Sequence, residues 1–195
     1  MSQVLKEEVK KRIYYAAIEE FYAHNYYLVK MKDIAERAGV PTGLIYSYYE
    51  NKKDLFKTIV EPVFQEIKKF LDSKGNAKIK GFDGVIREEE LDFMVELYYK
   101  RKQLFILIDK SEGTEFEDAK EELILLLEKH IRENLTGRVK KVDDRHLGFF
   151  YHILAGAFLE RIFEVFRHYE NYREAKKMIK LISQQHFYGI QYFIK

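Results

Sequence analysis

The sequence predicts an all-α protein of about nine helices, in which an N-terminal three-helix helix-turn-helix domain precedes a larger helical domain. Three observations support this fold class. Apolar residues recur at three- and four-residue spacings through most of the chain, which is the period of an α-helix packed on one side. Proline occurs only twice among 195 residues. No segment of useful length alternates apolar and polar residues as a half-buried strand does.

The first predicted helix covers residues 3–24, and its apolar stripe comprises Leu5, Val9, Ile13, Ala16, Ala17 and Phe21. Asn25 follows, a residue type that tolerates the left-handed conformation common at helix ends. A second helix is expected over residues 31–38, where Gly39 ends it. Pro41 suits the first position of a third helix over residues 41–49, because its missing N–H has no intrahelical partner there.

Residues 31–53 have the pattern of a helix-turn-helix. Ile34, Ala35 and Ala38 place small and apolar groups on one side of the first short helix. Ile45 and Tyr49 do the same for the second, so both are assigned to the core. In such a motif the second helix can enter the major groove of DNA.

The rest of the chain continues as helices. Asn51 caps a fourth helix that runs to about residue 71 and contains Pro62, which removes one hydrogen bond and typically kinks a helix. Residues 73–84 contain three glycines and are the best linker candidate. Further helices are expected over residues 86–99, 103–110, 114–135, 143–168 and 171 to the C-terminus. Thr114 with Glu117, and Asn171 with Glu174, have the spacing of helix N-terminal caps.

Composition excludes several classes of site. The chain has no cysteine, which excludes a disulfide scaffold, a thiolate zinc site and a cysteine nucleophile, and which fits a reducing cytoplasm. The six histidines show no metal-ligand spacing. No Ser-His-Asp pattern, glycine-rich phosphate loop or paired-carboxylate signature is present. We therefore expect no catalytic residues, no metal and no cofactor.

Charge and hydropathy point to a cytoplasmic protein. The net charge of +2 is too small to indicate nucleic-acid binding by itself. The N-terminal segment lacks the apolar region of a signal peptide. The most apolar run, residues 147–166, contains His152, Glu160, Arg161 and Glu164, so it predicts a buried helix rather than a membrane span.

Residues 12–56 carry a specific set of motifs, namely Asp33-Ile34-Ala35, Ala38-Gly39-Val40, Gly43-x-Ile45-Tyr46-x-Tyr48-Tyr49 and Asn51-Lys52-x-x-Leu55. This segment resembles the N-terminal domain of the TetR family of bacterial one-component transcriptional regulators. The resemblance covers about a quarter of the chain, and the remaining helices agree with the family only in number and order.

The resemblance implies a repressor that binds a double-stranded DNA operator of pseudo-palindromic sequence as a homodimer. It implies a DNA-binding domain at residues 1–52, and a helical domain at residues 53–195 that binds an effector and dimerises. A cavity among the fourth to eighth helices would take a small apolar or aromatic effector, whose binding would release the operator. The last two helices would form the dimer interface, setting the two recognition helices roughly 34–36 Å apart on one face of the DNA.

Matching the chain to the family motif assigns nine DNA-binding residues. The positions expected at base edges are Lys32, Thr42, Gly43, Leu44, Tyr46 and Ser47, and those expected at phosphates are Lys30, Tyr48 and Lys52. The alternative for Tyr46 and Tyr48 is that they are ordinary half-buried tyrosines. Because this recognition helix has few groups for bidentate hydrogen bonds, we expect modest base discrimination and an affinity that depends strongly on salt.

Candidates in the larger domain are less specific. The aromatic residues considered for the effector site are Phe93, Tyr98, Phe105, Phe150, Tyr151 and Phe158, although aromatic stripes are more often plain core. The small residues considered for the dimer interface are Gly148, Gly156 and Gly189, although they also suit close packing within one chain. Pro62 is a candidate hinge through which an effector changes the spacing of the recognition helices.

Two rival interpretations stay open at this level. One is a helical small-molecule-binding protein or enzyme whose helix-turn-helix no longer functions, which would prefer no DNA duplex. The other is a regulator of the same fold that activates transcription or ignores effectors.

Overall fold

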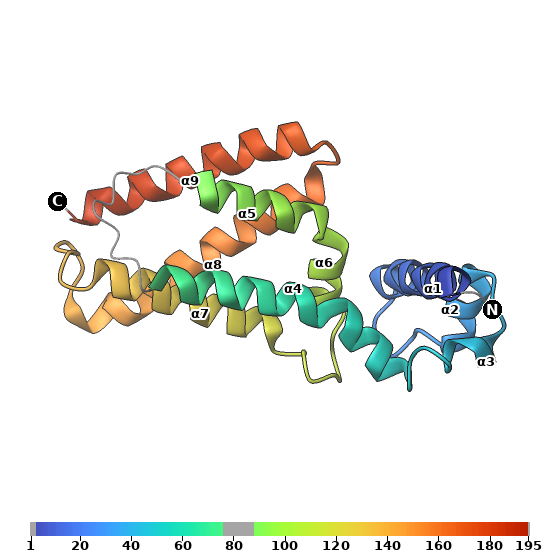
Figure 1. Cartoon of the computed structure of the whole chain (residues 1–195). Helices are drawn as coiled ribbons and strands as arrows, with labels where there is room; N and C mark the ends of the chain where they lie inside the picture. The colour runs from blue at the N-terminus through green and yellow to red at the C-terminus, as the bar shows by residue number, and fades with distance from the viewer. Residues whose placement is uncertain (1–2, 76–87, 195) are drawn as a thin grey trace. The chain divides into compact units, whose positions relative to one another are not determined.

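The structure, a computed structural model, describes residues 3–75 and 88–194, and every regular element in these ranges is an α-helix (Figure 1). The all-α prediction is confirmed. The helices are α1 (Gln3–Ala23), α2 (Met31–Ala38), α3 (Thr42–Ile45), α4 (Lys52–Gly75), α5 (Glu88–Tyr99), α6 (Arg101–Asp109), α7 (Ala119–Leu135), α8 (Asp144–His168) and α9 (Tyr172–Ile194). The predicted linker at residues 73–84 begins within α4, and its residues 76–84 lie outside the described residues.

The chain folds as two compact units. Unit 1 comprises Met1–Glu66 and Lys100–Lys120, so that α6 and the segment after it belong with the three N-terminal helices. Unit 2 comprises Ile67–Tyr99 and Glu121–Lys195. Helix α4 contributes to both units and continues through Pro62, which lies in unit 1. The predicted domains, residues 1–52 and 53–195, divide the chain by function, whereas the two units divide it by compact folding. The functional division stays a prediction.

The core of unit 1 follows from the helical period of its sequence. Ile13, Phe21, Ile34 and Ile45 have no exposed surface, and Leu55 at the start of α4 is equally buried. Burial of one such side chain stabilises the fold by about 1.5–3 kcal/mol. Of the predicted apolar stripe on α1, only Leu5 is exposed, with 45% of its surface accessible. Helix α6 packs against α1 through its own apolar side chains.

Helix ends in the structure agree with several predicted caps. The Asn51 Oδ1 atom accepts a hydrogen bond of 2.9 Å from the Asp54 amide at the start of α4. The Asn171 Oδ1 atom accepts one of 2.8 Å from the Arg173 amide at the start of α9. Gly39 ends α2 with φ at +63°. Glycine adopts this left-handed conformation without the steric cost that a Cβ atom brings.

Three local predictions are wrong. The third helix was expected over residues 41–49, whereas α3 ends at Ile45 and residues 46–48 form turns. Thr114 does not begin α7; its hydroxyl accepts a hydrogen bond of 3.1 Å from the Phe116 amide, and the helix starts at Ala119. Asn25 does not adopt a left-handed conformation, since no described residue other than glycine has a positive φ.

Unit 2 is built around the long antiparallel pair α8 and α9, with α5 packed on α9. Ala155 of α8 and Ile179 and Ile190 of α9 are buried in its core. The Tyr98 hydroxyl of α5 donates a hydrogen bond of 2.9 Å to the Tyr169 carbonyl oxygen, between α8 and α9. Among the described helices, none is both long and apolar enough to span a bilayer.

Candidate nucleic-acid interface

The turn between α2 and α3 is held by an arginine of α1. The Arg12 side chain donates hydrogen bonds to the carbonyl oxygens of Ala38 and Gly39, at 3.0 Å from Nε and 2.8 Å from Nη2. A Cβ atom on Gly39 would lie 2.9 Å from the Arg12 Nη2 atom. The positive φ favours glycine here, and a Cβ atom would in addition require the Arg12 guanidinium to shift.

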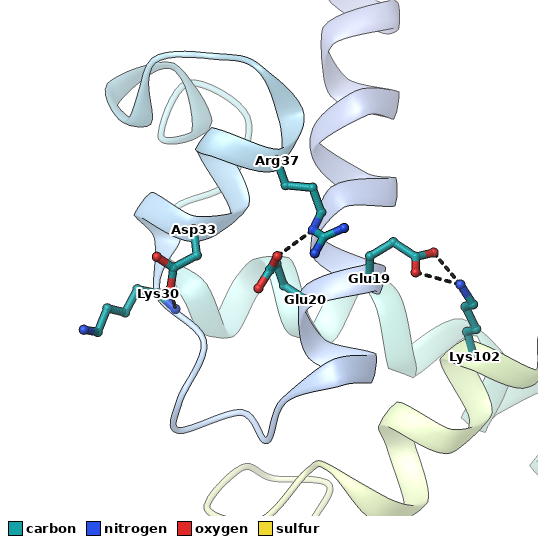
Figure 2. A network of polar contacts seen from close by, with 6 residues as sticks. All are labelled: Glu19, Glu20, Lys30, Asp33, Arg37 and Lys102. Carbon is teal, nitrogen blue, oxygen red and sulfur yellow. Dashed lines mark hydrogen bonds and ion pairs between the residues drawn. The ribbon is translucent and has the colours of Figure 1, made fainter.

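A second tie connects α2 to α1 through an ion pair. The Arg37 Nε atom of α2 lies 2.5 Å from the Glu20 Oε1 atom of α1, and Glu20 is only 9% exposed (Figure 2). On the neighbouring position of α1, the Glu19 carboxylate pairs with Lys102 of α6 at 2.6 Å. These contacts fix α2 relative to α1 and α6 within unit 1.

The apolar sides of α2 and α3 lie as the motif predicts. Ile34, Ala35 and Ala38 of α2 are buried, and Ile45 and Tyr49 are 0% and 3% exposed. Burial raises the pKa of the Tyr49 hydroxyl to about 12, so this side chain stays neutral. The assignment of both residues to the core is confirmed.

The nine predicted DNA-binding residues lie on the solvent side of this unit to different degrees. The exposed ones are Lys30, Lys32, Gly43, Tyr46 and Ser47, and the half-buried ones are Thr42, Leu44, Tyr48 and Lys52. With 54% of its surface accessible, Tyr46 is not the half-buried tyrosine of the alternative interpretation, whereas Tyr48 is half-buried. Gly43 has open space where a Cβ atom would stand.

The lysines among these residues differ in their surroundings. The Lys30 side chain points away from the surrounding helices in Figure 2, and its backbone amide donates to the Asp33 carboxylate at 3.3 Å. Lys52, the first residue of α4, instead donates from Nζ to the carbonyl oxygens of Tyr26 at 2.8 Å and Val29 at 3.0 Å. The same ammonium lies 4.3 Å from the centre of the Tyr26 ring. Burial lowers the pKa of Lys52.

The six aromatic candidates for an effector site do not form one group. Phe105 belongs to unit 1, while the other five belong to unit 2. Each of three has a close aromatic neighbour: Phe93 stacks on Phe70 at 3.8 Å, Phe150 meets Phe193 at 4.9 Å, and Phe158 meets His186 at 4.7 Å between ring centres. Tyr98 packs on Phe166, and Tyr151 lies near the Arg132 guanidinium. These contacts agree with the alternative of an aromatic core.

The three glycines of the predicted dimer interface have no close neighbour within the chain. A Cβ atom on Gly156 or Gly189 would meet no described atom within 4 Å, and one on Gly148 would make an ordinary contact of 3.9 Å with Arg132. Close packing within one chain therefore does not require glycine at these positions. The same two helices expose large apolar side chains, namely Phe149, Ile153, Leu181, Tyr188 and Tyr192.

Sequence reasoning missed the side chains that hold the interface in place. Arg12, Glu20 and the carbonyl contacts of Lys52 were not predicted, and neither was Glu115, which pairs with Lys53 at 3.1 Å and Lys57 at 3.0 Å. Each contact joins residues at least 17 positions apart. Helical periodicity could indicate only that Arg12 and Glu20 lie on α1. No described group of three or more histidine or carboxylate side chains is arranged to hold a metal ion.

Comparison with known proteins supports the helix-turn-helix assignment. Residues 13–59 match the family model described as bacterial regulatory proteins, tetR family. That match contains the whole of α2 and α3, together with parts of α1 and α4.

Solved structures are similar over nearly the whole chain. SmeT, the repressor of the Stenotrophomonas maltophilia multidrug efflux pump SmeDEF, is 18% identical, with 92% of this chain and 88% of that chain covered and a TM-score of 0.58. The SmeT–triclosan complex gives 16% identity, coverage of 93% and 90%, and a TM-score of 0.61. A transcriptional regulator of the TerR/AcrR family from Aquifex aeolicus VF5 is 19% identical, with 94% of this chain and 98% of that chain covered and a TM-score of 0.57. At these identities the likeness concerns the fold.

Proposed function

We propose that the chain is a bacterial transcriptional regulator of the TetR family, and that it is a repressor released from DNA by a small effector; residues 13–59 match the model of that family. Members of this family are helix-turn-helix DNA-binding proteins and not enzymes, and the same is proposed for this chain. The proposal adds three things: a pseudo-palindromic operator bound by a homodimer, an apolar or aromatic effector, and action in the cytoplasm. Residues 1–52 would bind the DNA, and residues 53–195 the effector and the second subunit.

One observation carries the DNA-binding part of the proposal. The recognition segment 42–48 presents exposed Gly43, Tyr46 and Ser47 on one side, while Ile45 and Tyr49 anchor its other side in the core. Hydroxyl groups can donate to or accept from base edges, and Lys32 at the start of α2 can reach guanine acceptors. Lys30 and Tyr48 are proposed to contact phosphates, which fix the position of the protein on the duplex.

Support for a homodimer comes from unit 2. Phe149 and Ile153 of α8, and Leu181, Tyr188 and Tyr192 of α9, are 49–69% exposed in the single chain. Large apolar side chains gathered on two adjacent helices are typical of a surface that another protein covers. Open space beside Gly156 and Gly189 would let a second copy approach closely. A two-fold axis there would give each dimer two recognition helices.

Support for an aromatic effector is the aromatic content of unit 2 and the triclosan complex of SmeT. Phe93, Tyr98, Phe150, Tyr151 and Phe158, which all belong to that unit, are the proposed lining residues. A ligand would have to separate some of the aromatic pairs that pack together in this structure.

The experiment begins with selection of bound duplexes from a random-sequence DNA pool. We expect an enriched sequence with two-fold symmetry, bound by two chains. Tyr48→Ala and Lys32→Ala should each weaken binding to that duplex, with Lys129→Ala on α7 as an exposed control. Failure to enrich any sequence would favour the rival interpretation of a small-molecule-binding protein with a non-functional motif.

The effector and the direction of regulation need separate measurements. Triclosan is the first probe, and we expect it to weaken binding to the recovered duplex. Transcription in vitro from a promoter that contains this duplex should fall when the protein is added and recover with the effector. Increased transcription on addition of the protein would instead identify an activator.

Pro62 is the proposed hinge. It lies in α4, four residues before Glu66, the last residue that this helix contributes to unit 1. A proline inside a helix removes one backbone hydrogen bond and weakens the helix locally. We expect Pro62→Ala to retain DNA affinity but to lose much of the effector-induced release, measured by titrating the effector against the bound duplex. Full release in the variant would contradict the hinge.

A further inference from the structure

We propose that Lys52 is a positioning residue for DNA binding, whose ammonium group holds the loop entering α2 rather than a DNA phosphate. The inference rests on the proposed DNA-binding function and changes the role that the family motif implies for this lysine. It follows from contacts that the chain makes with itself in unit 1.

The ammonium of Lys52 is already bound on several sides. Nζ donates to the carbonyl oxygens of Tyr26 and Val29, at 2.8 Å and 3.0 Å. An ammonium has three N–H donors, so two of them are used here. The face of the Tyr26 ring lies 4.3 Å from the same nitrogen, a distance at which the ring attracts a cation. Hydrogen bonds from a charged donor are stronger than those between neutral groups.

The two carbonyl groups belong to the segment that sets where α2 begins. Val29 is 2% exposed and directly precedes Lys30, the residue at the N-terminal cap of α2. Tyr26 is held in turn by an edge-on contact with Phe56 at 5.0 Å and by its amide, which donates to the Lys110 carbonyl oxygen at 3.1 Å. Lys52 therefore joins the first residue of α4 to the start of α2.

The consequence for DNA binding concerns Lys30 and Lys32. Both lie in the first turn of α2 or at its cap, are exposed, and have ammonium groups without a partner among the described residues. They can meet DNA without breaking an existing contact. A phosphate contact by Lys52 would instead require its ammonium to leave two carbonyl groups and the ring. Those carbonyl groups would then lose their charged donor, and the loop its link to α4.

The salt dependence of binding distinguishes the two roles. Each phosphate contact contributes about 0.9 to the slope of log affinity against log salt concentration. A residue that stabilises the loop without itself meeting a phosphate changes the affinity at every salt concentration, and it leaves the slope unchanged as long as the complex that forms keeps the same phosphate contacts. The readout therefore separates a lost phosphate contact from a displaced helix, which a single affinity cannot do.

The experiment uses the full chain and the duplex recovered by selection from a random-sequence pool, with titrations between about 50 and 200 mM salt. Lys52→Met keeps the apolar stem and removes the ammonium. Lys30→Met is the reference for a lost phosphate contact. Lys53→Met is the matched control, because it removes the same charge from the next residue, whose ammonium pairs with Glu115.

We expect Lys52→Met to weaken binding about tenfold at each salt concentration, as loss of a charge-assisted hydrogen bond allows. Its slope should equal that of Lys53→Met, whereas Lys30→Met should lower the slope by about 0.9. Backbone amides of residues 30–34 should exchange hydrogen faster in Lys52→Met than in Lys53→Met. Lys52→Gln, whose carboxamide has two N–H donors, is the second variant if Lys52→Met does not fold, and its slope should also be unchanged.

Three results would overturn the inference. A slope lowered by about 0.9 in Lys52→Met, or in Lys52→Gln where that variant is needed, would identify a phosphate contact. An unchanged affinity would show that the loop does not need Lys52. If the unmodified chain bound no duplex, the proposed function and this inference would both fail. If the unmodified chain binds and only the variants behave otherwise than expected, the inference alone fails.

Discussion

Gly43 lies in the first turn of α3, and apart from its chain neighbours and the backbone of its own helix, no described atom comes within 4 Å of the position that a Cβ atom would take there. Alanine has the higher helix propensity, so we expect Gly43→Ala to raise the free energy of unfolding by about 0.5–1 kcal/mol. We also expect it to weaken operator binding, because the added methyl group would stand between the backbone and the bases. Thermal unfolding and duplex titration on the same sample measure both effects. Unchanged DNA affinity would contradict a close approach of Gly43 to the groove.

His186 predicts a pH dependence of stability. It is 6% exposed, and burial together with the nearby charge of Arg161 lowers the pKa of its imidazole from 6.5 to about 4. Between these two pH values the unfolded chain binds a proton that the folded chain excludes, so stability falls as the pH decreases. We expect the loss to reach about 3 kcal/mol at most.

Denaturant unfolding at several pH values between 4 and 7.5 measures this loss, with His186→Gln as the control that removes the titrating group. Other groups titrate in both proteins, so the difference between the two curves isolates His186. Parallel curves would mean that the imidazole becomes charged within the folded protein.

Single residues also show what the sequence could predict about the interface. Periodicity placed Ile45 and Tyr49 in the core, because the two apolar residues are four positions apart on the same predicted helix, and both are buried. It could not find the partners of Lys52, since these are backbone carbonyl groups 26 and 23 positions away and any residue type has one. For the same reason the motif alone implied a phosphate contact there.

At the scale of elements, the wrong predictions share a physical cause. Tyr48 and Tyr49 both donate amide hydrogen bonds to the Ile45 carbonyl oxygen, at 2.9 Å and 3.0 Å, so the backbone after α3 continues as turns. Apolar spacing cannot separate such turns from a regular helix. Thr114 and Glu117 do bind backbone amides as a capping box does, but the turn that they close ends before α7 begins. Helix existence was therefore predictable, and some helix ends were not.

The segment between α6 and α7 contains Gly113, and Gly137 in the loop after α7 is a matched control for it. Gly113 and Gly137 have φ values of +76° and +73°, so alanine is strained at both. A Cβ atom on Gly113 would also clash with the Tyr27 hydroxyl group, whereas one on Gly137 would meet no other part of the described chain within 4 Å. We expect Gly137→Ala to cost about 1 kcal/mol of stability and Gly113→Ala more than that, because Tyr27 must move.

Calorimetric unfolding of both variants measures the difference. The double variant Gly113→Ala with Tyr27→Ala should return to about the cost of Gly137→Ala, relative to Tyr27→Ala alone. Equal destabilisation by the two single variants would mean that the Tyr27 ring moves away without loss. The ring has 61% of its surface exposed, so it has room to do so.

At the scale of the whole molecule, the two units differ in how much their sequences reveal. The family model matches residues 13–59, which lie entirely in unit 1. The structural likeness covers more than nine-tenths of the chain at 16–19% identity in the three structures compared. Many different apolar sequences satisfy the same helix packing, so the helical fold of unit 2 was predictable from its periodicity, whereas the identity of the proposed effector was not.

The proposed homodimer makes a prediction that belongs to the assembled molecule. Ile153 of α8 and Leu125 of α7 are aliphatic residues of unit 2 with 49% and 50% of their surfaces exposed. Ile153 follows Phe149 by one helical turn and precedes Gly156, so it lies on the proposed interface, and Leu125 is on another helix. An aspartate buried there without a partner would oppose association, because a charge removed from water needs compensation.

We therefore expect Ile153→Asp to shift the protein from dimer to monomer in sedimentation velocity experiments, whereas Leu125→Asp stays dimeric. Both aspartates are exposed in the single chain, so neither should unfold it, and circular dichroism checks this. A monomer carries only one recognition helix, so Ile153→Asp should also lose most of its affinity for a two-fold symmetric duplex and retain that for a single half-site. Equal behaviour of the two variants would place the dimer interface on a surface other than α8 and α9.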